Sequence, residues 1–547
     1  MRKILGLVLV LLLITSDCYS RSMSFSFSSG SLTDAQRVNV AGGFGMTFYE
    51  DYEKGGSLDA DFSLGSPTAT FTWSTTNSTR TYVDSNGVIQ IADTVNTPRF
   101  MGGYYNVNGF NNIKGLMIES ASTNLITGTD GTLYAGGTGA SLWTGWTIYK
   151  NTANAPTTDN NDASSICSIS GATTQSTTYV DGADTNANIV LQSPVSANAS
   201  VANGDTVTGS VWLRTSGIDA TVNVAVEVYA YDLWSGIVRN SFSVILSLSS
   251  SWKKFSKILN VTNKTGSITK FEDGGGGKTV VTSASHTLRT ATAYNTVTIS
   301  GTTNYNGTYI ITAATANTFT ITKTFVADDA TGDWVCAISK ASFKVTVSNI
   351  DQGETVNIEA YGAQLEVAPY PTSFIPTTTA ALTRNAETLK YEIAGNRTAS
   401  TESFAMKFIP SWTGSIITAY MYLTDTDTKS RIMVGDYERD SMGIYPNYTD
   451  NVTATAYAST DVTSLYSHTC IATMSSTGNP NSTIYYDGVS EGTNNTDFTA
   501  NAWGTYFYIG SSNVPGSQLN GIVQKVAIFN RALTAGEASS VYNLMKD

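Results

Sequence analysis

The sequence is poor in charged side chains, histidine and cysteine, and each shortage excludes a class of protein. Charged residues make up 14% of the 547 residues, too few for long amphipathic helices with a solvated face. Two histidines and four cysteines are too few for a cluster of metal-ligating residues or a framework of disulfides. The net charge of −12 repels phosphate backbones and anionic lipid, so we expect no nucleic-acid partner.

Beyond residue 20, only Cys167, Cys336 and Cys470 remain. Cys167 and Cys336 fall in strand-like segments of one expected domain, so in an exported protein they could form a disulfide. Two buried free thiols are an equally good interpretation, because free cysteine behaves as a small apolar side chain. The sequence leaves both open.

The one long apolar run lies at the N-terminus. Arg2 and Lys3 precede the apolar residues 4–14, and small and polar residues follow up to Ser20. The run is too short to cross a bilayer core of about 30 Å as a helix. It is typical of a secretory signal peptide over residues 1–20, which predicts a secreted or extracellular protein; an uncleaved apolar arm is the alternative. No later segment is apolar enough to span a membrane, so we expect no span in the mature chain.

Glycine, tyrosine and threonine are abundant, and this composition favours short strands joined by tight turns. The length predicts several domains. We therefore predict an all-β protein of tandem β-sandwiches, with a small inserted β-module and one short C-terminal helix. The expected parts are a flexible arm (21–56), an N-terminal β segment (57–123), a first sandwich (124–268 and 335–377) interrupted by the inserted module (269–334), a linker (378–397) and a second sandwich (398–547).

Alternation of side chains locates the strands of the first sandwich. The valines at 222, 224, 226 and 228 share one face of a predicted strand, and Tyr229 and Tyr231 share the other. In the inserted module, at least four short strands are expected, among them 279–282, 296–300, 308–312 and 318–322, and we expect the host sandwich to resume at 334–338.

The stretch 358–377 reads as the last strand of the first sandwich followed by a proline-rich exit. Unbroken alternation would place Ile358, Ala360 and Gln364 on one face and Glu359 and Leu365 on the other. Three prolines, at 369, 371 and 376, then prevent further strand pairing, because proline has no N–H to donate. At the C-terminus, Thr534 and Glu537 have the spacing of a capping box, which predicts a helix to about residue 545.

Several motifs in a fixed order resemble a family of bacteriophage and prophage virion proteins. They are Leu58-Asp-Ala-Asp-Phe62, Thr81-Tyr-Val-Asp-Ser-Asn-Gly-Val-Ile89, Thr97-Pro-Arg-Phe100, Gly115-Leu-Met-Ile-Glu-Ser-Ala-Ser-Thr-Asn-Leu125, Tyr361-Gly-Ala-Gln-Leu-Glu366, Pro371-Thr-Ser-Phe-Ile-Pro-Thr377 and Leu382-Thr-Arg-Asn-Ala386. The resemblance covers roughly residues 57–390 and implies a jelly roll similar to carbohydrate-binding modules. Where the family carries an arginine after Glu119, this chain has Ser122. The inserted module is similar to a small β-module of phage structural proteins.

The C-terminal block resembles the laminin G-like, concanavalin A-like lectin domains. The matching residues are Tyr485-Tyr-Asp-Gly-Val489, Phe507-Tyr-Ile-Gly510 and the stretch from Gly521 to Thr534. Domains of this fold often hold calcium at one rim, so the resemblance makes calcium the one candidate cofactor. Oxygen ligands could come from three loop aspartates, which in the alternative interpretation only favour turns. These candidates are Asp425, Asp427 and Asp436.

The residues available for catalysis argue against an enzyme. Neither His286 nor His468 lies beside a serine or cysteine nucleophile motif, and Gly-x-Ser-x-Gly is absent. A glycosidase needs two carboxylates that face one another across a sugar. Glu359 and Glu366 are expected on opposite faces of one strand, so they cannot form such a pair.

Sugar binding requires aromatic platforms and nearby polar groups. The candidates in the first sandwich are Tyr229, Tyr231, Trp234, Trp143 and Trp146, and those in the second are Tyr445 and Trp503. Packing in the sandwich, or cover by a loop or by the inserted module, is the alternative for the first five. Trp212 is interpreted as core or edge packing.

We therefore expect a non-catalytic extracellular or virion-associated recognition protein that binds glycans through tandem β-sandwiches. Its partners would be cell-surface or extracellular polysaccharide. The alternative is a purely structural virion, fibre or decoration protein, whose partners would be other virion proteins or further copies of the chain. A polysaccharide-degrading enzyme is the third interpretation.

Overall fold

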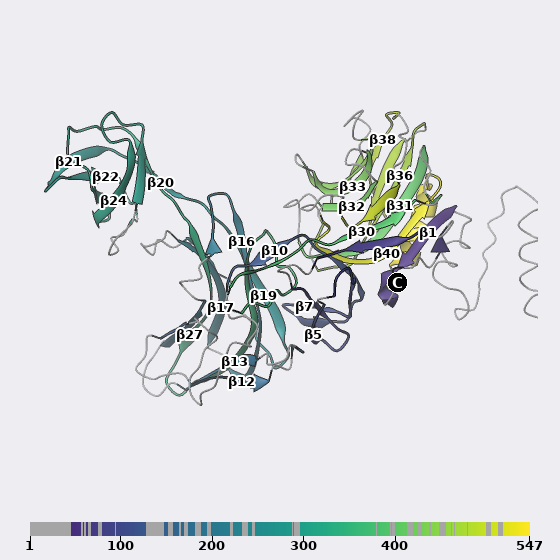
Figure 1. Cartoon of the computed structure of the whole chain (residues 1–547), viewed down its shortest axis with the longest axis horizontal. Coiled ribbons are helices and arrows are strands. Elements are labelled where there is room, and N and C mark those ends of the chain that lie inside the picture. The colour runs from purple at the N-terminus through teal and green to yellow at the C-terminus, as the bar shows by residue number, and fades with distance from the viewer. Residues whose placement is uncertain are drawn as a thin grey trace, which may run out of the picture.

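In the computed structural model, the regular secondary structure of the described residues is almost wholly β-strand, which confirms the all-β prediction (Figure 1). The structure describes residues 45–546 with gaps, of which the longer are 127–146, 151–156, 181–186, 194–198, 232–238, 289–295, 413–418, 448–455, 499–504 and 512–517, and the others span four residues or fewer. The predicted signal peptide and most of the predicted arm lie outside the described residues.

The first sandwich consists of two antiparallel sheets that share one core. The sheet orders are β11-β14-β27-β17-β18, with β15 beside β27, and β12-β13-β28-β16-β19. The strands are β11 (Thr147–Lys150), β12 (Thr157–Ala163), β13 (Thr173–Val180), β14 (Ala187–Gln192), β15 (Ala199–Ser200), β16 (Thr206–Ile218), β17 (Asn223–Tyr231), β18 (Arg239–Phe242), β19 (Lys253–Asn260), β27 (Lys340–Ile350) and β28 (Thr355–Val367). The valines at 222, 224, 226 and 228 are all buried in the core, as their alternation predicted.

The two faces of β28 exchange at Gly362, and the expectation of unbroken alternation over 358–365 is wrong. Gly362 has φ +62°, and the register of β28 against β16 shifts between Ser210 and Trp212. Ala360 faces the sandwich core before this bulge and Ala363 faces it after. One extra residue on a bulged strand changes the face that every later side chain occupies.

The bulge therefore places Glu359 and Glu366 on the same face of β28, not on opposite faces as predicted. They still do not form a catalytic pair. Glu359 pairs with Arg214 at 2.6 Å on the partly exposed sheet surface, whereas Glu366 is fully buried.

The inserted module is a separate seven-stranded sheet with the order β20-β26-β23-β24-β25-β22-β21, at one end of the molecule (Figure 1). Its strands are β20 (Lys264–Ser267), β21 (Lys270–Gly275), β22 (Lys278–Thr282), β23 (Thr296–Ser300), β24 (Gly307–Ala314), β25 (Thr318–Ile321) and β26 (Asp333–Cys336). The four predicted strands are present. The host sandwich resumes only at β27, because β26 pairs with β20 and β23 inside the module; its predicted resumption at 334–338 is wrong.

The second sandwich is larger than predicted, because N-terminal strands complete both of its sheets. The orders are β2-β1-β40-β31-β36-β37-β38, with β9 beside β40 and β6 beside β9, and β3-β30-β39-β32-β33-β34-β35. The first sheet contains β1 (Met46–Asp51), β2 (Phe62–Ser63), β6 (Arg99–Met101), β9 (Gly115–Ile118), β31 (Thr401–Pro410), β36 (His468–Ser475), β37 (Ser482–Tyr486), β38 (Val489–Asn494) and β40 (Gly521–Phe529). The second contains β3 (Ala69–Thr72), β30 (Thr388–Glu392), β32 (Ala419–Thr424), β33 (Lys429–Asp436), β34 (Arg439–Asn447), β35 (Ala456–Tyr457) and β39 (Tyr506–Ile509).

Three of the expected parts of the chain are assigned differently by these pairings. Residues 46–51 were expected in a flexible arm, but they form β1, which is buried along its whole length and pairs with β40. The segment 57–123 was expected to lead into the first sandwich, and 378–397 to be a linker. Instead β3, β9 and β30 are strands of the second sandwich. The three units are thus nested: the inserted module interrupts the first sandwich, which interrupts the second.

Short elements complete the fold as the local sequence requires. The hairpin of β4 (Thr81–Val83) and β5 (Ile89–Ile91) turns at Gly87, which has φ +79°, a conformation that glycine adopts without steric cost. Two further pairs are β7 (Tyr104–Asn106) with β8 (Gly109–Asn111), and β10 (Ser122–Asn124) with β29 (Leu382–Arg384). The helix α3 (Ala535–Met545) has the predicted capping box, and the short 3-10 helix η1 covers Tyr52–Lys54.

Candidate functional site

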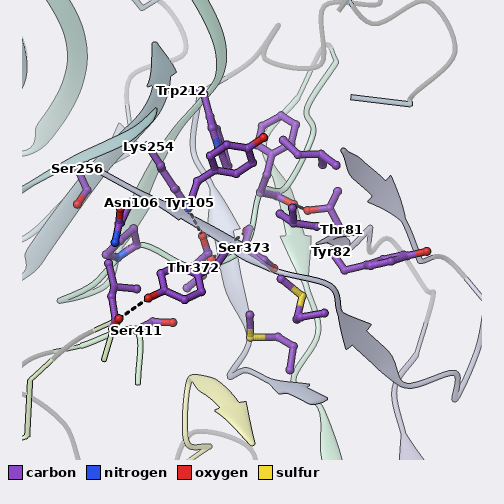
Figure 2. A pocket seen from close by; sticks show the side chains of 18 of the residues that line it. Thr81, Tyr82, Tyr105, Asn106, Trp212, Lys254, Ser256, Thr372, Ser373 and Ser411 are labelled. Atoms are coloured by element: carbon purple, nitrogen blue, oxygen red, sulfur yellow. Dashed lines mark hydrogen bonds between the residues drawn. The ribbon is translucent and has the colours of Figure 1, made fainter. Parts of the chain in front are cut away.

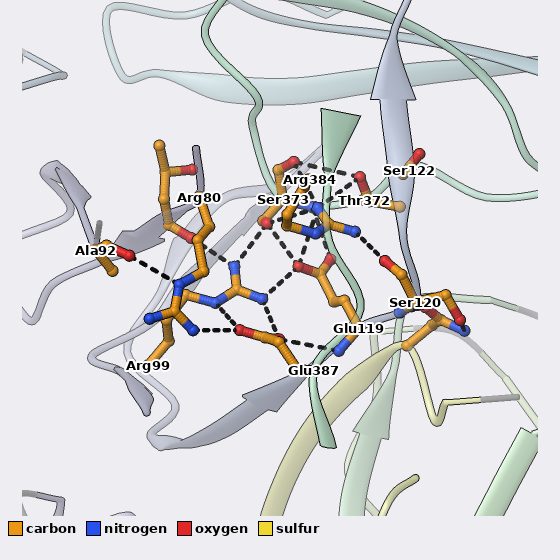
Figure 3. A network of polar contacts seen from close by, with 12 residues as sticks. Arg80, Ala92, Arg99, Glu119, Ser120, Ser122, Thr372, Ser373, Arg384 and Glu387 are labelled. Carbon is orange, nitrogen blue, oxygen red and sulfur yellow. Dashed lines mark hydrogen bonds and ion pairs between the residues drawn. The ribbon is translucent and has the colours of Figure 1, made fainter. Parts of the chain in front are cut away.

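A buried network of charged side chains lies where the two sandwiches meet (Figure 3). Arg99 from β6 is at its centre. Its Nη2 is 2.7 Å from Glu119 Oε2, and its Nε and Nη2 donate to the two carboxylate oxygens of Glu387 at 2.8 and 2.5 Å. Arg80 Nη1 donates to Glu387 at 2.8 Å. All four side chains are at most 1% exposed, so each charge depends on its partners for stabilisation.

Arg384 and Glu366 extend the network to the proline-rich exit of the first sandwich. Arg384 Nη1 is 3.2 Å from Glu119 Oε2 and donates to Thr372 Oγ1 at 3.0 Å. Glu366 accepts hydrogen bonds from the Thr372 backbone N–H at 3.1 Å and from Ser122 Oγ at 2.5 Å. Burial by itself raises the pKa of Glu119, but Arg384 and Arg99 outweigh it and hold that pKa at about 2. The Glu119 carboxylate therefore stays ionised, and it is paired with Arg99 and Arg384.

Several of the motifs that carried the virion resemblance meet in this network. Arg99 comes from the third motif, Glu119 from the fourth, and Thr372 and Arg384 from the last two, while Arg80 directly precedes the second. Their shared role is to fasten the exit of the first sandwich to the second. Ser122 retains a place in the network through its hydrogen bond to Glu366.

A cavity of about 240 Å³ lies against the network, between the first sandwich, the β4–β5 and β7–β8 hairpins and the loop before β36 (Figure 2). Aromatic side chains form much of its wall: Tyr82, Tyr104, Tyr105, Trp212 and Phe374. At the mouth are Asn106, Asn108 and Tyr466, the last of which is 67% exposed. Aromatic surface with polar groups at the rim is the arrangement that binds amphipathic ligands such as sugars.

Lys254 from β19 is the cation that lines this cavity. Its Nζ donates to the Thr372 carbonyl oxygen at 2.9 Å and lies 4.6 Å from the centre of the Trp212 ring (Figure 2). Burial lowers the pKa of Lys254 to about 8, although Glu366 and Glu119 act in the opposite direction. Among the described residues, no carboxylate lies within ion-pair distance of its ammonium group.

Trp212 contributes a second unused donor. The residue is 3% exposed, and its Nε1 has no hydrogen-bond partner among the described residues. Its ring packs edge-on against Phe374, with 5.9 Å between ring centres, and beside Gly362, where a Cβ would come within 2.9 Å of the ring. The bulge at Gly362 thus leaves room for the Trp212 ring. Trp212 packs in a buried hydrophobic cluster, as the sequence predicted, and also lines the cavity.

Of the residues predicted to bind sugar, only the side chain of Tyr229 is among those described. It is half-buried on the outer face of β17, where its hydroxyl donates to Glu227 at 3.1 Å. Lys344 Nζ lies 4.2 Å from the ring centre and pairs with Glu227 at 2.6 Å, so one ring face is already occupied. Tyr231 and Tyr445 lie in β17 and β34, and their side chains lie outside the described residues, as do Trp143, Trp146, Trp234 and Trp503 entirely.

The proposed calcium ligands are likewise not brought together by what is described. Asp425 and Asp427 lie outside the described residues, and Asp436 is the last residue of β33. In the described ranges, no group of three or more histidine, cysteine, aspartate or glutamate side chains could hold a metal ion. Calcium binding stays a prediction.

The histidines make structural hydrogen bonds, and the described cysteines are buried. His468 Nδ1 lies 2.8 Å from Asp487 Oδ2, and its Nε2 lies 2.9 Å from the Thr463 carbonyl oxygen, which ties the β37–β38 turn to the preceding loop. His286 accepts a backbone hydrogen bond from Leu288 at 2.9 Å. Cys167, Cys336 and Cys470 are all buried free thiols, so the disulfide considered for the first two is not formed.

Sequence reasoning missed Lys254, Tyr82 and Tyr105 as site residues. Alternation within 252–260 places Lys254 and the buried Phe255 on opposite faces of the strand. This pattern could have indicated that Lys254 does not face the core. Nothing local indicates that the hairpins at 81–91 and 104–111 fold over this strand. No helix in the described residues is long and apolar enough to cross a membrane.

Residues 404–539 match the family model for the concanavalin A-like lectin/glucanases superfamily, which supports a concanavalin A-like, laminin G-like domain over that part of the chain. No curated protein matches the sequence. Solved structures similar to part of the chain include domain 4 of an extracellular arabinanase from Geobacillus stearothermophilus, at 13% identity over 29% of this chain and 73% of that one, with a TM-score of 0.23.

The binding domain of botulinum neurotoxin DC is similar at 10% identity over 29% of this chain and 40% of that one, with a TM-score of 0.23. Trypanosoma rangeli sialidase is similar at 10% identity over 87% of this chain and 98% of that one, with a TM-score of 0.21. From TM-scores of this size we infer nothing about function.

Proposed function

We propose that this chain is a non-catalytic, extracellular glycan-recognition protein and that the cavity at the junction of its sandwiches is a sugar-binding site. The observation that carries the proposal is the composition of the cavity wall, in which tyrosine and tryptophan rings surround unused polar donors. The lectin-like fold of the C-terminal sandwich supports the same class of ligand.

The physical basis is the two-sided character of a sugar ring. Its C–H face packs on aromatic rings, while its hydroxyl groups require hydrogen-bond partners. Tyr82 and Tyr105 supply half-buried aromatic surface, and Asn106 and Asn108 supply amides at the mouth. The volume of about 240 Å³ is a little below the range of about 300–1,000 Å³ typical of drug-sized ligands. It suits one or two sugar rings, with the rest of a glycan chain outside.

The carboxylates beside the cavity are unsuited to glycoside hydrolysis. A general acid must be protonated near neutral pH, and its pKa is raised for that purpose. The pKa of Glu119 is held at about 2, because two arginines outweigh the effect of burial. Glu366 accepts hydrogen bonds from Gln364, Thr372 and Ser122, so its oxygens are already occupied. These groups favour recognition over catalysis.

A glycan array with the full chain and two variants tests the proposal. Tyr82→Ala removes a half-buried wall of the cavity, and we expect it to weaken binding on the order of tenfold. Tyr309→Ala, in the inserted module, is the matched control and should bind like the unaltered chain. Equal binding by Tyr82→Ala would place the sugar elsewhere.

The same array separates two further sites and the structural alternative. Because Lys344 occupies one face of the Tyr229 ring, Tyr229→Ala should leave cavity binding unchanged. Lost binding in Tyr229→Ala together with normal binding in Tyr82→Ala would restore the sheet-face site predicted from sequence. No binding to any glycan, with copurification in particles, would favour a virion structural protein. Mass spectrometry of the mature N-terminus tests the proposed secretion.

A further inference from the structure

We infer that the sugar bound in the junction cavity is acidic, of the uronic-acid type, with its carboxylate held by Lys254 Nζ and Trp212 Nε1. This inference rests on the proposed function, since it names the class of sugar for the same site. Its basis is the pair of unused donors on adjacent strands, β19 and β16, that line one cavity.

The ammonium group of Lys254 has unmet bonding capacity. An ammonium carries three N–H donors, and one of them is used by the Thr372 carbonyl oxygen at 2.9 Å. Its other described contact is with the face of the Trp212 ring. A half-buried cation with spare donors attracts an anion strongly, because little water competes for it.

The buried charges around Lys254 balance one another without it, so its positive charge has no matching negative charge. Arg80, Arg99 and Arg384 are balanced by Glu119, Glu366 and Glu387, and all six side chains are buried. Lys254 is therefore a fourth cation beside a network that is already neutral. The charged groups that act on it are Glu366 and Glu119, which favour its charge, and Arg384, which opposes it. A bound carboxylate would supply the missing negative charge.

The second donor favours a carboxylate over a hydroxyl group. The Nε1–H of Trp212 is buried without a described partner, and an unpaired buried donor is costly until a ligand accepts from it. Lys254 Nζ lies 4.6 Å from the centre of the same ring, so the two donors lie close together in the wall of one cavity. A carboxylate has two oxygens and can accept from both donors.

The protonation of Lys254 should make the binding of an acidic sugar depend on pH. Burial lowers its pKa to about 8, so it is mostly charged at pH 7 and mostly neutral at pH 9.5. An acidic sugar should therefore bind well at pH 7 and poorly at pH 9.5. A neutral sugar in the same cavity should bind alike at both.

The test uses isothermal titration calorimetry of the full chain with oligogalacturonate and its carboxyl-reduced, neutral counterpart. We expect the acidic probe to bind at least tenfold more tightly than the neutral probe at pH 7. Lys254→Met should weaken the acidic probe about 10- to 100-fold and leave the neutral probe within about twofold. Lys257→Met, on the same strand but directed to its other face, removes the same charge and should change neither.

Each outcome bears on one claim only. Equal affinity of the two probes, with loss of both in Tyr82→Ala, would overturn the acidic assignment while leaving glycan binding in the cavity intact. Binding of neither probe, together with no signal on the array, would overturn the proposed function itself. Trp212→Phe keeps an aromatic ring but removes the N–H, and it should weaken the acidic probe selectively. Unchanged binding by both Lys254→Met and Trp212→Phe would also overturn the inference.

Discussion

Arg99 and Glu387 form a buried two-bond ion pair, although they lie 288 positions apart in the sequence, with Nε–Oε1 and Nη2–Oε2 distances of 2.8 and 2.5 Å. Glu387 also accepts from Arg80 and from the backbone N–H of Glu119. One carboxylate, directly before β30, thus joins three segments from the N-terminal part of the chain.

Glu387→Gln should destabilise the protein by about 3–5 kcal/mol, because it leaves the charges of Arg99 and Arg80 buried without their shared partner. Urea denaturation followed by circular dichroism would measure the change. Glu272→Gln is the matched control, since Glu272 pairs with Lys270 at 2.6 Å on the exposed surface of the inserted module. It should have little effect. Similar small losses in both variants would contradict the structural role of the network.

Acid should unfold the junction between about pH 4.5 and pH 2. The pKa of Glu119 is about 2 in the folded protein and 4.5 as an unperturbed group, so the unfolded state binds a proton first as pH falls. Its contribution to stability is complete above pH 4.5 and is lost as pH drops towards 2. Denaturation midpoints at pH 5, 3.5 and 2.5 should fall in that order. A flat profile would show that Glu119 is not held ionised.

Lys254→Met should stabilise the free protein at pH 7, by roughly 1–3 kcal/mol, because it removes a cation whose burial lowers its pKa from 10.5 to about 8. The unaltered protein gains stability as pH rises from 8 to 10.5, since only its unfolded state stays protonated there. The advantage of the variant should therefore shrink by pH 10.5. Thermal melts across this range measure it, and a variant less stable than the original at pH 7 would contradict the prediction.

Gly362→Ala should cost more than an ordinary glycine substitution. Gly362 has φ +62°, which a side chain tolerates poorly, and a Cβ would lie 2.9 Å from the Trp212 ring. We expect a loss of about 2–5 kcal/mol from strain and overpacking together. Gly395→Ala is the control, because its φ is +83° but a Cβ there would meet nothing within 4 Å. Equal losses of stability in the two variants would mean that the Trp212 ring moves aside at no cost, which would contradict the prediction.

Local sequence patterns correctly predicted the features that depend only on residues close together in the sequence. The valine alternation in β17 and the capping box at Thr534 are both present, because each is decided within a few residues. The four strands of the inserted module follow from the same kind of pattern.

The site could not be predicted in this way, because long-range pairing creates it. A Ser/Gly-rich background concealed β1, and only its pairing with β40 shows that residues 46–51 belong to a sheet. The bulge at Gly362 depends on the partner strand β16, so period-two counting failed there. Lys254 acquires its surroundings only when two distant hairpins and the exit of the first sandwich meet above it.

The nesting of the three units dictates an order of events during synthesis. Strand β1 is made early, yet its partner β40 begins at Gly521. At translation rates of roughly 5–20 residues per second, β1 waits on the order of 25–100 s for that partner. The inserted module and the first sandwich are complete on the ribosome long before then. The inserted module and the first sandwich can therefore fold before the second sandwich. Until β40 is made, the apolar side chains of β1 stay unpaired and must be kept from aggregating.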